Sequence, residues 1–105
     1  MDKKLDVIKE KVKFLSINRT RGFDVLAMQT MEECGELIQA LSKYVRDDSA
    51  AELIRRSKKE NVIEEISDVL VCIERLKDWL DISDEEVKNM MLFKLDRTIE
   101  RGKSK

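Results

Sequence analysis

Two segments of the sequence repeat one pattern, a pair of carboxylates three residues apart inside a run of apolar residues with helical spacing. Glu33 and Glu36 form the first pair, and Glu65 and Asp68 form the second. An α-helix turns by about 100° per residue, so residues three or four apart share a face. On that geometry Glu33 and Glu65 lie within the apolar stripes of their helices, and their partners lie at the margins. The pattern therefore predicts two long helices that each turn a carboxylate toward the core.

The rest of the chain also favours helices. It has no proline and only three glycines, and its apolar residues recur at helical spacing. We expect helices over residues 2–16, 23–46 and 62–80 and from residue 83 onward, with a turn at 47–49 and one or two helical turns within 50–56. A chain of 105 residues fits a single domain. The predicted fold is therefore all-α, a single domain of residues 1–105 in which about four helices form a small antiparallel bundle.

The apolar stripes of these helices are wide for so short a chain. A domain of this size buries only about two-thirds of the surface of its unfolded chain. We therefore expect a second subunit to complete the bundle, as a homodimer or a homotetramer.

Carboxylates on a face that packs into a core need a partner of opposite charge. An unpaired buried charge is costly, and four carboxylates between two antiparallel helices repel one another. A divalent cation relieves both problems, and an all-oxygen site suits Mg²⁺ or Mn²⁺. Pairing with lysine or arginine is the alternative that the sequence leaves open. Glu32 and Glu64 occupy matching positions turned further toward solvent, and we expect them to support the ligands rather than to bind the metal.

Composition excludes several classes of function. The net charge is −1, with 21 basic and 22 acidic residues, which gives no global case for binding nucleic acid or a membrane surface. The chain has no histidine, so a Ser-His triad and a histidine base are both absent. Cys34 and Cys72 fall on predicted core faces and are expected to be buried thiols in a reducing compartment. With no signal peptide or membrane span in the pattern, a cytoplasmic location is expected.

Cations near the C-terminus offer a candidate phosphate site. Lys94, Arg97 and Arg101 recur at intervals that place them on one helical face, which suits the charge of a triphosphate. An ordinary basic last turn, favoured by the helix dipole, explains them equally well. The basic loop before residue 23 is a weaker candidate for substrate contact, and Trp79 is expected in the core or an interface rather than under a nucleobase.

The carboxylate pattern resembles that of the MazG-type nucleoside triphosphate pyrophosphatases, an all-helical superfamily that includes the dimeric dUTPases and the phosphoribosyl-ATP pyrophosphohydrolases. The resemblance rests on residues 32–37 (EECGEL) and 64–70 (EEISDVL). It extends more weakly to residues 94–97 (KLDR) and Arg101, and it covers most of the chain from about residue 29 to the last of these cations.

The resemblance implies a Mg²⁺-dependent nucleotide pyrophosphatase that releases pyrophosphate and a nucleoside monophosphate from an NTP or dNTP. The four carboxylates would be both its metal ligands and its catalytic groups, and house-cleaning of non-standard nucleotides would be its task. Two alternatives remain open. One is a relative with a different substrate, such as phosphoribosyl-ATP or dUTP, and the other is a non-catalytic helical interaction module.

Overall fold

The structure is a computed structural model that describes residues 2–46 and 52–103. The regular secondary structure of these residues consists of four α-helices: α1 (Lys3–Ile17), α2 (Phe23–Arg46), α3 (Glu52–Leu80) and α4 (Asp84–Lys103). The predicted all-α class with four helices is confirmed. The turn expected at residues 47–49 lies outside the described residues.

Side chains that directly precede α1 and α4 cap the N-terminal ends of these two helices. The Asp2 carboxylate accepts hydrogen bonds from the backbone N–H groups of Lys4 and Leu5, so it caps α1. At α4 the Ser83 hydroxyl accepts a 3.1 Å bond from the backbone N–H of Glu86 and bonds the Glu86 carboxylate as well. The two bonds form a capping box.

Helix α3 begins earlier than the sequence pattern indicates. It starts at Glu52, so the helical turns expected within residues 50–56 are present from Glu52 onward and continue without a break into the helix expected from residue 62. A 3.5 Å ion pair between Glu52 and Arg56 spans the first turn. Residues 52–61 lack an apolar stripe, but they also lack glycine and proline, so nothing in them breaks a helix. Asn61, directly before the predicted start, consequently lies inside α3.

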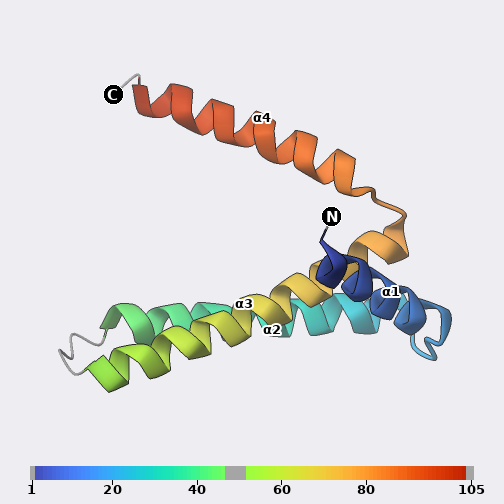
Figure 1. Ribbon diagram of the computed structural model, residues 1–105, viewed down its shortest axis with the longest axis horizontal. Coiled ribbons are helices and arrows are strands. Elements are labelled where there is room, and N and C mark those ends of the chain that lie inside the picture. Colours follow the sequence, from blue (N-terminus) through green and yellow to red (C-terminus); the bar gives the residue numbers. More distant parts are fainter. Residues whose placement is uncertain (1, 47–51, 104–105) are drawn as a thin grey trace.

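The packed part of the molecule is built on α3. Figure 1 shows α2 and α3 as neighbouring antiparallel helices, with α1 against the C-terminal half of α3. Few side chains are buried among the described residues; they are Val12, Leu26, Ala40 and Cys72. Cys34 is exposed, so its expected burial is wrong, although both cysteines are free thiols.

Ion pairs join α1 to α3 along their shared edge. Lys9 contacts Glu74 at 3.1 Å, and one turn later in both helices Lys13 contacts Asp78 at 2.8 Å. Residue numbers increase in the same direction along both helices from the first pair to the second, so α1 and α3 run parallel where they meet. Asp84, the first residue of α4, joins the first pair through a 2.7 Å contact with Lys9.

Helix α4 lies apart from the other three helices. Figure 1 shows it leaving the end of α3, and within the described ranges only α2 with α3 and α1 with α3 pack side by side. Its large apolar side chains are exposed: Met90, Met91, Leu92, Phe93, Leu95 and Ile99. The described part of the chain therefore leaves the apolar side chains of α4 without a helix packed against them. Completion of the bundle by a second subunit stays a prediction.

No membrane-spanning segment occurs in the described part of the chain, since none of its helices combines enough length with enough apolar character.

Candidate metal centre

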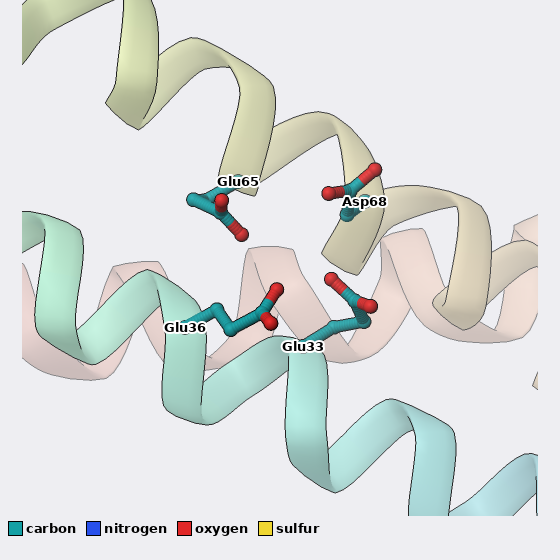
Figure 2. A group of neighbouring side chains, drawn as sticks. All are labelled: Glu33, Glu36, Glu65 and Asp68. Atoms are coloured by element: carbon teal, nitrogen blue, oxygen red, sulfur yellow. The ribbon is translucent and has the colours of Figure 1, made fainter.

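Four carboxylates meet where α2 faces α3. Glu33 and Glu36 come from α2, and Glu65 and Asp68 come from α3; one oxygen of each lies within 4.8 Å of the others. Figure 2 shows the two pairs pointing toward one another across the space between the helices. The spacing that the sequence repeats thus brings together all four predicted ligands.

The heptad positions of the two helices explain this convergence. Glu33 lies seven residues after Leu26 and seven before Ala40, and both of these neighbours are only 3% exposed. Glu65 lies seven residues before Cys72, which is also buried. Seven residues are nearly two full helical turns, so these side chains share the interhelical face. Glu33 and Glu65 therefore occupy positions that an apolar residue would fill in an ordinary helix pair.

The inner carboxylates have no partner of opposite charge in the part of the chain that the structure describes. The Oε2 atoms of Glu33 and Glu65 are buried, and neither has a hydrogen-bond partner among the described residues. None of the four carboxylates takes part in the ion pairs found in residues 2–46 and 52–103. Pairing with lysine or arginine, the alternative explanation for these acids, has no support in this part of the chain.

The environment shifts the acidity of both inner carboxyl groups in the same direction. Burial raises the pKa of Glu33, and repulsion from Glu36, Asp68 and Glu65 adds to the rise. Burial also raises the pKa of Glu65, again with repulsion from Glu36 and Asp68. Each shift means that the charged carboxylate is disfavoured where it stands. A bound cation would relieve this penalty, so the four carboxylates form a group of oxygen donors that could hold a metal ion.

The other predicted site residues lie outside this cluster. Glu32 and Glu64 are exposed, and neither belongs to the group of converging oxygens, although Glu64 adds to the repulsion that raises the pKa of Glu65. The predicted phosphate-binding cations, Lys94, Arg97 and Arg101, are exposed on α4, which packs against neither α2 nor α3. Within one chain they are therefore not brought to the carboxylates.

A second group of polar residues borders the same helix pair. The guanidinium of Arg19 lies 3.8 Å from the centre of the Trp79 ring, and Phe23 meets that ring edge-on at 5.9 Å between centroids. Arg75 donates a 3.4 Å hydrogen bond to the amide oxygen of Gln29. Neither Gln29 nor Arg75 was predicted as a site residue from the sequence. Their spacing from the carboxylate pairs, one turn before Glu33 and two turns after Asp68, could have identified both.

No known family model, curated protein or solved structure matches the chain.

Proposed function

We propose that the protein is a Mg²⁺-dependent nucleoside triphosphate pyrophosphohydrolase that converts an NTP or dNTP into a nucleoside monophosphate and pyrophosphate. The observation that carries the proposal is the convergence of four carboxylates, two of which bury oxygens without partners among the described residues. The likeness of residues 32–37 and 64–70 to the MazG-type motifs supplies the reaction class.

The four carboxylates would hold the cation. When bound, Mg²⁺ supplies positive charge against the phosphate oxygens and makes a water molecule more acidic. Glu33 and Glu65 would bind from the interhelical face, while Glu36 and Asp68 are more exposed and would bind at the margin that a substrate can reach. All four are held by two long packed helices, so their spacing requires no rearrangement of a loop.

The reaction needs one proton acceptor from the chain. Water attacks the α-phosphorus, the bond from this phosphorus to the bridging oxygen breaks, and pyrophosphate leaves with that oxygen. The water gives up its proton as the new bond forms. Since the chain has no histidine, a carboxylate of the cluster is the available acceptor.

A homodimer or homotetramer belongs to the proposal. A second subunit would cover the exposed apolar side chains of α4, and the small number of buried residues in the described chain also favours association. A second subunit could also place Lys94, Arg97 and Arg101 over the carboxylates, where they would bind substrate phosphates. A cytoplasmic location fits free thiols and a nucleotide substrate.

The test is release of pyrophosphate from a panel of standard and modified NTPs and dNTPs, with Mg²⁺ and with EDTA. We expect turnover in Mg²⁺ only, and a loss of at least about 100-fold in Glu36→Gln and Asp68→Asn, the range for removing electrostatic stabilisation of a transition state. Glu10→Gln on the exposed face of α1 is the matched control and should retain activity.

The panel also separates the alternatives. Turnover of dUTP or phosphoribosyl-ATP alone would identify a relative with a narrow substrate range. Absence of turnover together with absence of metal binding would refute the proposal and leave a helical interaction module, which the exposed apolar face of α4 would suit.

A further inference from the structure

A cavity of about 300 Å³ lies at the end of the α2–α3 pair where the chain crosses from α1 to α2. Its walls come from the loop of residues 18–22, from Gln29 on α2, and from Arg75 and Trp79 on α3. The four carboxylates are not among its lining residues. The cavity is thus a separate feature on the same pair of helices.

The cavity is positively charged. Arg19, Arg21 and Arg75 line it, and none of its lining residues is acidic. None of the three arginines takes part in an ion pair within the described ranges. The charge of Arg19 helps to lower the pKa of Asp78, but the Asp78 carboxylate is already paired with Lys13 at 2.8 Å. The three guanidinium groups are therefore available to an external anion.

Two of the guanidinium groups are held in place before any ligand arrives. Arg19 is stacked on Trp79 at 3.8 Å and donates a 3.3 Å hydrogen bond to the carbonyl of Ser16. Arg75 donates to Gln29. Preorganised guanidinium groups lose less freedom when they bind, and their planar array of donors suits phosphate oxygens.

The cavity lies within reach of a ligand that is bound at the carboxylates. Gln29 precedes Glu33 by four residues, and Arg75 follows Asp68 by seven, which correspond to about 6 Å and about 10 Å along the helices. A polyphosphate whose first phosphate lies at the carboxylates can therefore extend toward the arginines. Because Arg19 already covers one face of Trp79, the cavity suits phosphate better than a stacked nucleobase.

We propose that the outer phosphates of the substrate bind in the cavity of Arg19, Arg21 and Arg75. This assignment rests on the proposed pyrophosphatase function. It supplies phosphate-binding cations from the same chain as the carboxylates, whereas the cations of α4 would need a second subunit.

The single tryptophan of the chain reports on this cavity directly. Inorganic pyrophosphate should change the fluorescence of Trp79 in a saturable way in EDTA, where no hydrolysis occurs. Arg19→Gln and Arg75→Gln should each weaken this binding by about tenfold, as expected for a lost charge-assisted hydrogen bond. Arg46→Gln, which removes a guanidinium at the far end of α2, is the matched control and should bind like the wild type. Melting temperatures establish that each variant is folded.

The kinetic arm uses the same variants with the nucleotide that the panel identifies. Arg19→Gln and Arg75→Gln should raise KM by about tenfold and change kcat less, since the outer phosphates are bound before and during the reaction. Turnover with an unchanged KM would overturn this inference and leave the proposed function intact. If pyrophosphate binds but no nucleotide is turned over, the cavity is an anion-binding site, and the inference that it binds the outer phosphates of a substrate is refuted. An uncharged nucleoside that binds where pyrophosphate does not would show a base pocket instead and overturn the inference.

Discussion

Glu33 on α2 and Glu65 on α3 each direct an oxygen into the interface between their helices, and neither Oε2 atom finds a hydrogen-bond partner among the described residues. Such an arrangement opposes folding, because charged carboxylates are desolvated and repel their neighbours there. A carboxyl group whose pKa is higher in the folded protein than in the unfolded chain stabilises the fold at pH values below its ordinary pKa of 4.5. This stabilisation is lost as the pH rises through the pKa of the folded protein.

Glu33→Gln should therefore raise the melting temperature at pH 7 in EDTA, since the amide removes a charge that the site disfavours. It should also abolish the stabilisation of the wild type by Mg²⁺, which would be about 2.7 kcal/mol at a concentration 100 times the dissociation constant. Thermal unfolding with and without Mg²⁺ measures both effects. Glu10→Gln is the control. A variant that melts lower than the wild type in EDTA would contradict this account of the cluster.

The ion pairs of Asp84 predict the response of the fold to acid. Hydrogen bonds from Lys77 and Lys9 lower the pKa of Asp84 from 3.8 to about 2. A carboxyl group whose pKa is lower in the folded protein than in the unfolded chain stabilises the fold at pH values above its ordinary pKa. This stabilisation disappears as the pH falls through the pKa of the folded protein. Wild type should therefore exceed Asp84→Asn in free energy of unfolding at pH 6, and the difference should shrink between about pH 4 and pH 2. Urea titrations at a series of pH values measure it, and a constant difference would contradict the pairing.

The same network predicts a loss of stability in alkali. Lys77 contacts Asp84 at 2.6 Å and Glu74 at 2.9 Å, and these partners raise the pKa of its ammonium group despite partial burial. Its contribution is present below the ordinary value of 10.5 and is lost as the pH rises through the raised value. Lys77→Met should lower the free energy of unfolding at pH 8, and its deficit relative to wild type should narrow above about pH 10.5.

Gly35 offers a test of helix propensity within α2. A Cβ atom placed on it meets nothing within 4 Å among the described residues, so an alanine fits at this position. Gly35→Ala should stabilise α2 by about 1 kcal/mol, the propensity difference between these residues. Urea unfolding provides the measurement. Destabilisation instead would indicate that another subunit packs closely against this position.

Asp81 carries backbone strain between α3 and α4. Its φ of 56° lies in the left-handed region, and the backbone N–H of Ile82 bonds the carbonyl of Lys77 at 2.8 Å, which closes the end of α3. Asp81→Gly should add up to about 1 kcal/mol of stability, because glycine adopts this conformation without a Cβ penalty. Asp81→Asn is the matched control, since it removes the charge and keeps the Cβ. Equal gains from both variants would assign the effect to the helix dipole rather than to strain.

Some of this structure could be predicted because it follows from local spacing. Glu33 and Glu65 were placed on the core faces by helical periodicity alone, and the structure brings them together with Glu36 and Asp68. The capping box of Ser83 and Glu86 is equally local.

The differences arise where local pattern does not decide the outcome. The first turns of α3 have no apolar stripe, so their helical state depends on propensity and continuity with the packed turns that follow. Cys34 shares the apolar arc of α2, but it is exposed in the structure, because periodicity alone does not fix how much of an apolar arc is covered by a neighbour. The position of Arg75 in a cavity with Arg19 and Trp79 depends on how the helices pack, so helical spacing within α3 does not predict it.

The separation of α4 has a consequence for the kinetics of local opening. A helix without lateral packing depends on its own backbone hydrogen bonds, whereas most helical stability in proteins comes from tertiary packing of an apolar face. In a monomer, the amide hydrogens of α4 should therefore exchange with solvent far faster than those of α2 and α3, as an independent cooperative unit. Protection of α4 that rises with protein concentration would locate the surface through which copies of the chain associate.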